Sequence, residues 1–228
     1  MPEAPQKKFS HLHTHTQYSI LDGMNKIPKL VDQAAESGIG GFAVTDHGNL
    51  FALPEVLREQ KSANERGVKI AMGCEFYVTD DRLQKNKESD TYHLTAIAKD
   101  NVGLESLMKL STRAYTEGFY SHPRIDLDLL SEHKEGLIVL SGCLGGQVAQ
   151  ALKDGNKAKA MDLVGAYHDI FGDNYFLEVM PLEIREQIDV NAAIFEISKR
   201  TGIETVTTCD CHYQKKEHYA AHDTWLAI

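Results

Sequence analysis

Histidines and aspartates that could bind metal ions occur in three short segments of this 228-residue sequence. Imidazole nitrogens suit zinc and iron, and carboxylate oxygens also suit manganese. In an extended chain, side chains two residues apart point the same way, so a pair with this spacing can reach one ion. The sequence therefore predicts a cluster of divalent metal ions. The three segments are His13-Thr14-His15, Asp46-His47 and Asp210-Cys211-His212.

Strand-like and helix-like segments alternate along the chain and would position these groups. Seven segments are rich in Val, Ile, Phe or Tyr and have turn residues nearby, which is typical of strands. Apolar residues recur at helical spacing over 27–35, 102–115, 157–171 and 184–199, with Asn25 as the expected cap of the first helix and Gly38 as its end. The alternation favours a parallel sheet, and the chain length favours its closure into a barrel. The predicted strands cover 9–13, 41–45, 68–78, 93–98, 137–141, 175–179 and 204–208.

Further groups able to bind metal fall at or near the ends of the predicted strands. Asp22 lies in the loop after the first strand, and Glu75 lies in the third. His93 begins the fourth strand, and Cys143 follows the fifth. The C-terminal strand ends of such a barrel converge on one face, where active sites are built. Together with the three segments, these residues are too many for one four-coordinate zinc ion and fit two or three ions.

The other histidines and cysteines are interpreted as surface or packed side chains, because a single residue of either type is more often structural than a ligand. The sequence contains neither G-x-S-x-G nor G-x-x-x-x-G-K-[ST]. The Gly-rich stretch 142–146 could cradle a phosphate or present Cys143 as a nucleophile, but it lacks the G-x-G-x-x-G spacing. The residues set aside are His11, His122, His133, His168, His218, His222, Cys74, Cys209 and Cys211.

Composition limits the setting in which this site would act. The formal net charge is -9 and there is no dense run of Lys or Arg, which argues against strong unaided binding to DNA. The N-terminus has no apolar export signal, and no apolar run is long enough to span a bilayer. We therefore expect a cytoplasmic monomer with reduced cysteines and no membrane contact, and a disordered leader over residues 1–8.

Six stretches of the sequence carry a resemblance to a known family: "HLHTHTQYSILDG", "AVTDHGNL", "GCEFYV", "YHLTAIAKDNVGLESLMKLSTRAYTEGFYSHPRID", "EGLIVLSGCLGG" and "CDCHY". Together they resemble the polymerase and histidinol phosphatase (PHP) domain, in the branch found at the N-terminus of bacterial replicative DNA polymerases. The resemblance implies a single α/β domain over residues 9–214, folded as a distorted (β/α)7 TIM-like barrel. Residues 215–228 resemble the start of a segment leading to a polymerase body, which is absent here, so we do not expect DNA polymerisation.

The family resemblance also implies a ligand set. Three divalent ions, chosen from Zn2+, Mn2+ and Fe2+, would be held by nine residues, with Asp46 in a supporting role. Asp22 and Asp210 would be catalytic, by bridging ions or orienting the attacking water. Apart from the resemblance, Arg124 could bind the substrate phosphate, with a surface role as the alternative. Cys209 replaces the usual Asn, and Cys143 stands where other branches use His, which favours a softer metal such as zinc. The nine ligands are His13, His15, Asp22, His47, Glu75, His93, Cys143, Asp210 and His212.

By this resemblance we expect a metal-dependent phosphoesterase that uses a metal-activated hydroxide. Its substrate would be a DNA 3′ end, as in a 3′–5′ proofreading exonuclease within the parent polymerase, or a small phosphomonoester. The alternative is a structural metal-binding module that stabilises the polymerase and docks the rest of that chain and other replication proteins, without hydrolysis. A free-standing histidinol-phosphate phosphatase is less favoured, because the sequence follows the polymerase branch so closely.

Overall fold

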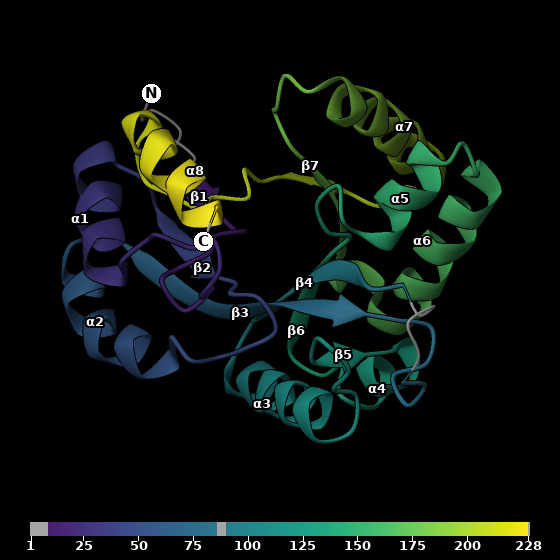
Figure 1. Ribbon diagram of the computed structural model, residues 1–228, viewed down its shortest axis with the longest axis horizontal. Coiled ribbons are helices and arrows are strands. Elements are labelled where there is room, and N and C mark those ends of the chain that lie inside the picture. Colours follow the sequence, from purple (N-terminus) through teal and green to yellow (C-terminus); the bar gives the residue numbers. More distant parts are fainter. Residues whose placement is uncertain (1–8, 86–89, 228) are drawn as a thin grey trace, which may run out of the picture.

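A curled mixed sheet forms the centre of the protein, with helices around its outside (Figure 1). The computed structural model describes residues 9–85 and 90–227, so the expected leader over 1–8 lies outside the described residues. The strand order is β1-β2-β3-β4-β6-β7-β8, and β5 pairs with β3. All seven predicted strands are present, and β5 is additional. The strands are β1 (Ser10–His11), β2 (Gly41–Val44), β3 (Lys69–Val78), β4 (Tyr92–Ala98), β5 (Arg124–Ile125), β6 (Leu137–Leu140), β7 (Tyr175–Val179) and β8 (Thr205–Thr207).

The helices cover the sheet with their apolar faces. The first ends at Gly38, as predicted, in the left-handed conformation with φ 69°. The predicted cap at Asn25 is wrong, because Lys26 is the N-cap residue and the Asn25 amide donates instead to the carbonyls of His15 and Cys211. The α-helices are α1 (Ile27–Ser37), α2 (Leu53–Glu65), α3 (Asn101–Thr116), α4 (Leu127–Glu132), α5 (Gln147–Lys153), α6 (Lys157–Phe171), α7 (Arg185–Thr201) and α8 (Tyr219–Leu226), with short 3-10 turns η1 (Gly172–Asn174) and η2 (Lys216–His218).

Strand β4 runs antiparallel to its neighbours, which corrects the expectation of a parallel sheet in a distorted (β/α)7 barrel. It pairs antiparallel with both β3 and β6. The described part of the connection from β3 to β4 contains no helix. A parallel return normally needs a crossover of a dozen or more residues, usually a helix, so this connection suits an antiparallel return. The fold is therefore a single mixed α/β domain.

The two edges of the curled sheet are joined just beyond the ends of β1 and β8. Thr14 and Cys211 form a parallel bridge there. The amide of His15 donates to the carbonyl of Cys211 at 2.9 Å, and the amide of Cys211 donates to the carbonyl of His13 at 3.1 Å. These bonds bring the first and last predicted metal-binding segments side by side.

Two large clusters of buried apolar side chains stabilise this arrangement. One packs α1 and α2 against β2 and the first half of β3, and the other lies among α3 to α7 and strands β3 to β7. Burial of such side chains is the main favourable term in folding. Among the described residues, no helix is both long and apolar enough to cross a membrane. The first cluster includes Ile27, Val31, Val44, Val56 and Met72, and the second includes Phe76, Leu94, Leu107, Tyr167 and Leu177.

Candidate metal centre

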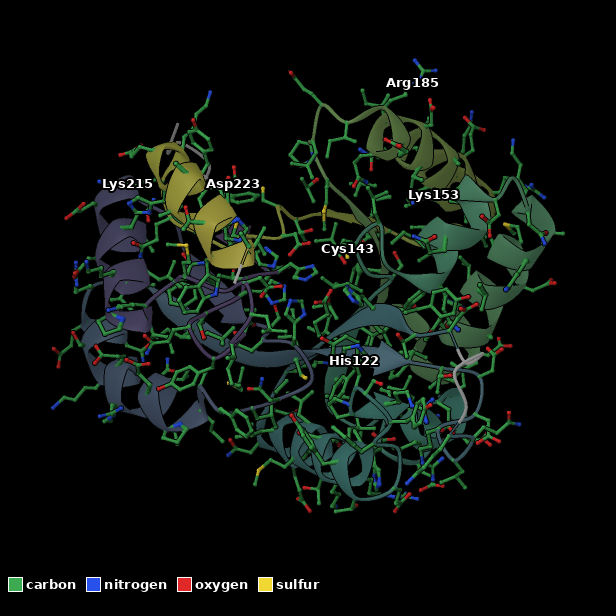
Figure 2. All side chains as sticks on the ribbon, in the orientation of Figure 1. His122, Cys143, Lys153, Arg185, Lys215 and Asp223 are labelled. Atoms are coloured by element: carbon green, nitrogen blue, oxygen red, sulfur yellow. The ribbon has the colours of Figure 1, made fainter. Side chains whose placement is uncertain are left out.

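The strand ends bring all nine predicted ligands into one region at the centre of the sheet, where Figure 2 labels Cys143. His93 reaches it because β4 is antiparallel. As the second residue of β4, His93 pairs with Tyr77 near the end of β3. The beginning of β4 therefore lies beside the C-terminal end of β3.

His13, His15 and Glu75 form the buried floor of the centre. Their side chains are exposed by 0%, 0% and 1%. His13 Nε2 lies 3.3 Å from Glu75 Oε1, and His15 Nε2 lies 3.5 Å from Glu75 Oε2. Asp210 approaches from the open side, with Oδ1 at 3.1 Å from His15 Nε2 and 3.6 Å from His13 Nε2. These four groups surround one point.

Glu75 also belongs to a second group, with His93 and Cys143. His93 Nδ1 lies 3.0 Å from Glu75 Oε1, and Cys143 Sγ lies 3.6 Å from His93 Nδ1. The loop that carries Cys143 approaches the imidazole closely at Gly145, where a Cβ would lie 3.1 Å from His93 Nδ1. The absence of a side chain at Gly145 lets the thiol and the imidazole meet.

A third group joins His15 to His47 and His212. The ring centroid of His15 lies 4.1 Å from that of His47 and 4.3 Å from that of His212. Asp22 closes the group, with Oδ2 at 3.0 Å from His47 Nε2 and 3.7 Å from His212 Nε2. The side chain of Asp22 is 25% exposed and that of Asp210 is 24% exposed, so both carboxylates lie nearer to solvent than the floor does.

The donor atoms of these groups fit divalent cations. In each three-residue group of histidine, cysteine or glutamate, the candidate ligand atoms lie within 4.8 Å of one another. Six atoms of the predicted ligands are buried and have no hydrogen-bond partner among the described residues. Leaving a buried polar atom without a partner costs about 1–3 kcal/mol, and cations bound at the three groups would give these atoms partners. The atoms are His13 Nε2, His15 Nε2, Asp22 Oδ1, His47 Nδ1, Glu75 Oε2 and Asp210 Oδ1.

Opposite charges also hold the centre together when protons take the place of metal. Burial alone would lower the pKa of His47, but the nearby carboxylates of Asp22 and Glu75 outweigh this and raise the pKa to about 10. Burial would raise the pKa of Asp210, but His13 and His15 lower it to about 2. The centre therefore favours ionised carboxylates beside positive charge, and cations can supply that charge.

Glu178, on β7, supports the floor and was missed in the sequence. Its Oε1 lies 2.8 Å from His13 Nδ1, and the hydroxyl of Thr208 donates to the same oxygen. Glu178 is 2% exposed. The sequence signal was present, since a charged residue interrupts the otherwise apolar strand Tyr175–Val179.

Asp46 lies behind the ligands, where it fixes the loop after β1. It accepts hydrogen bonds from the amide of Thr16 at 2.6 Å, from the Thr16 hydroxyl at 2.8 Å and from the Ser19 hydroxyl at 2.7 Å. Ser19 Oγ in turn lies 3.2 Å from His15 Nδ1. Asp46 is thus placed to orient His15 through Ser19, in the supporting position expected for it.

Arg124 does not lie with the ligands as an exposed phosphate contact, and the prediction of that role is not supported. The residue is 1% exposed. Its guanidinium donates to the carbonyls of Gly118 at 3.0 Å, Arg82 at 3.2 Å and Gln84 at 2.8 Å. Arg124 therefore ties the loop before β5 to the connection after β3.

The fold and this cluster of candidate ligands define a domain of the PHP class, and the PHP domain family matches residues 11–181. The chain belongs to the PHP domain family. It is 41% identical to the DNA polymerase III subunit alpha of Treponema pallidum over 225 residues, which cover 96% of this chain and 19% of that protein. The Thermus aquaticus subunit is 41% identical over 228 residues, with coverage of 97% and 18%. The chain thus spans about a fifth of the length of these curated relatives.

Solved structures share the fold at much lower identity. A Bifidobacterium adolescentis protein described as a candidate metal-dependent phosphoesterase has a TM-score of 0.52 at 15% identity, covering 93% of this chain and 91% of its own. An amidohydrolase from Chromobacterium violaceum, with bound sulfate and no metal, has a TM-score of 0.53 at 13% identity, with coverage of 95% and 96%. At these identities the likeness concerns the fold alone.

Proposed function

We propose that this domain is a metal-dependent phosphoesterase. One observation carries the proposal. Buried nitrogen and oxygen atoms of the predicted ligands have no hydrogen-bond partner among the described residues, and the ligands form three overlapping groups. A protein of the same fold is described as a candidate metal-dependent phosphoesterase, which is in keeping with this chemistry. We infer three divalent ions, with zinc, manganese and iron as the candidates for this mixture of imidazole, carboxylate and thiol.

The buried and the partly exposed residues of the centre would have different roles. The floor residues His13, His15 and Glu75 would hold cations away from bulk water. Bound divalent ions supply Lewis acidity, which activates water and offsets the charge on a phosphate. Asp22 and Asp210 stand at the open side, where each carboxylate could accept a proton from the attacking water or orient it.

The proposed substrate is a phosphodiester at the 3′ end of DNA, with small phosphomonoesters as the alternative. The likeness to replicative polymerase subunits supports a DNA substrate in a longer chain, as in a 3′–5′ proofreading exonuclease. The net charge of -9 argues for a weak hold on DNA by these 228 residues alone. A small phosphoester would then be hydrolysed more readily than DNA by the isolated domain.

The decisive experiment uses protein purified with manganese or zinc, with metal content measured by elemental analysis. Release is followed from a 3′-labelled DNA strand and from a phosphomonoester such as p-nitrophenyl phosphate. We expect about three ions per chain, and hydrolysis that Asp22→Asn or Asp210→Asn reduces by at least about a hundredfold. Protein with its metals bound and no activity on either substrate would contradict the proposal.

A structural module is the second candidate, because the metal groups join segments from both ends of the fold. Ligands before β2 meet Asp210 and His212, which follow β8. A structural role for the metals predicts that Asp22→Asn and Asp210→Asn lower the melting temperature and that the unsubstituted protein has no hydrolysis to lose. In a longer chain such a module would dock the rest of the polymerase and its replication partners. Hydrolysis abolished by either substitution would count against this candidate.

A further inference from the structure

Three near-parallel rings lead from the metal centre toward solvent. Tyr77 stacks on His122, with centroids 4.4 Å apart and planes at 23°. On the inner side, the Tyr77 centroid lies 6.2 Å from that of the predicted ligand His47, with planes at 26°. Tyr77 also meets His93 edge-on at 5.5 Å. Figure 2 shows His122 near the middle of the molecule, in the same view as Cys143. His122 is exposed, so the stack ends at the surface.

The loop that presents His122 is fixed in place from several directions. Ser121 adopts φ 60°, in the left-handed region that residues other than glycine rarely use. Such strain persists only where the surroundings hold it, and it concentrates at functional sites. Arg124 anchors the loop by donating to three backbone carbonyls. Pro123 packs so closely on Gly48 that a Cβ there would lie 2.7 Å from Pro123 Cγ.

Core packing alone does not explain why His122 is held against Tyr77. An exposed histidine contributes little to a core, yet a strained turn and a buried arginine hold this one against Tyr77, beside the ligands. Aromatic side chains placed in this way are the usual platform for a nucleobase, because every base offers a planar face. The predicted ligands His47 and His93 both lie beside Tyr77, the inner ring of this pair.

We propose that His122, supported from behind by Tyr77, forms a subsite whose outer face stacks against a nucleobase of a substrate whose phosphate lies at the metal centre. The subsite makes the centre select nucleotide phosphoesters over phosphoesters that carry no planar ring. This inference rests on the proposed function for the position of the phosphate. Its test measures binding and does not require hydrolysis.

The test compares two ligands that differ only in the base, thymidine 5′-monophosphate and 2-deoxyribose 5-phosphate, by calorimetry on metal-loaded protein. We expect the nucleotide to bind at least about fivefold more tightly, since stacking on one aromatic side chain is worth roughly 1–3 kcal/mol. His122→Ala and Tyr77→Leu should abolish the difference, and His122→Phe and Tyr77→Phe should retain it. Metal content is measured for every variant.

Phe119→Ala is the matched control, because Phe119 is a 47% exposed aromatic residue of the same loop that stacks on Tyr115. It should leave the preference for the nucleotide unchanged. A purely structural stack would alter the melting temperature but not the ratio of the two affinities. If Tyr77→Leu does not fold, the exposed His122 decides the question alone.

The outcomes separate the subsite from the proposed function. Equal binding of the two ligands to the unsubstituted protein overturns the subsite, even if the protein hydrolyses phosphoesters. A preference for the nucleotide that survives His122→Ala overturns it as well. A preference that His122→Ala removes, in a protein without hydrolysis, supports the subsite and counts against the phosphoesterase.

Discussion

Glu178 accepts a hydrogen bond from His13, with Glu178 Oε1 2.8 Å from His13 Nδ1 and both side chains fully buried. A carboxylate can only accept, so His13 carries a proton on Nδ1, and Nε2 is the ring atom that faces the centre. A carboxylate that orients a metal-binding histidine in this way also raises its basicity. Glu178 is thus a positioning residue for the floor of the site.

Replacing Glu178 should weaken metal binding without unfolding the domain. We expect Glu178→Gln to lower metal affinity by about 10- to 100-fold, because the amide no longer fixes the His13 ring with a full negative charge. Competition with a chelating dye measures the affinity. Glu204→Gln, an exposed change beside β8, is the control. Unchanged affinity in Glu178→Gln would remove the positioning role.

Asp46→Asn should destabilise the loop after β1. Both carboxylate oxygens accept hydrogen bonds, so an amide would place an NH2 group against the donors on Thr16 or Ser19. Hydrogen bonds to a charged group contribute about 1.5–3 kcal/mol, and we expect the free energy of unfolding to fall by that amount. Urea titration measures it, with Asp32→Asn as an exposed control. A loss equal to that of the control would contradict the expectation.

Arg124→Lys should lower stability through the three carbonyls that the guanidinium serves. Lysine retains the charge but cannot reproduce a planar fork of donors. We expect the free energy of unfolding to fall by about 2 kcal/mol or more, as measured by urea titration, since buried carbonyls lose their partners. Normal stability combined with weakened phosphate binding would restore the role of Arg124 as a phosphate contact.

The metal-free domain should lose stability as the pH rises from 6.5. The folded state raises the pKa of His47 from 6.5 to about 10, so its contribution is complete below pH 6.5 and is lost as the pH rises through 10. Thermal melts in EDTA between pH 6 and pH 10 should therefore show a falling melting temperature, and His47→Gln should flatten the slope. Saturating manganese should abolish the fall, because metal binding needs deprotonated ligands. A melting temperature in EDTA that stays level or rises would contradict this linkage.

Much of the site could be predicted because residue types that bind metal ions occur at or near the ends of predicted strands. Asp22, Glu75 and Cys143 were expected near the histidine pairs, and the structure brings them there. His93 was expected too, but for an incomplete reason. Its place depends on the reversal of β4, and the connection before it, which has no helix in its described part, suits that reversal.

What could not be predicted depends on contacts between distant parts of the chain. An arginine in a polar loop gives no sign that it will be buried, as Arg124 is, against carbonyls that precede it by about 40 residues. The prediction that Asn25 caps the first helix was wrong for a similar reason, because the side-chain amide of Asn25 donates to the distant carbonyl of Cys211. His122 looked like a surface residue, and only the folded loop shows that it stacks on Tyr77.

The bridge between Thr14 and Cys211 also sets a time at which the site can form. Its partners are separated by about 200 residues, and pairing across such a distance is slow because the loop must close first. At roughly 5–20 residues per second, a ribosome would deliver Asp210 and His212 about 10–40 seconds after His13 and His15. A metal ion captured during synthesis would therefore first meet an incomplete set of ligands, and the complete centre would be among the last parts of the domain to assemble.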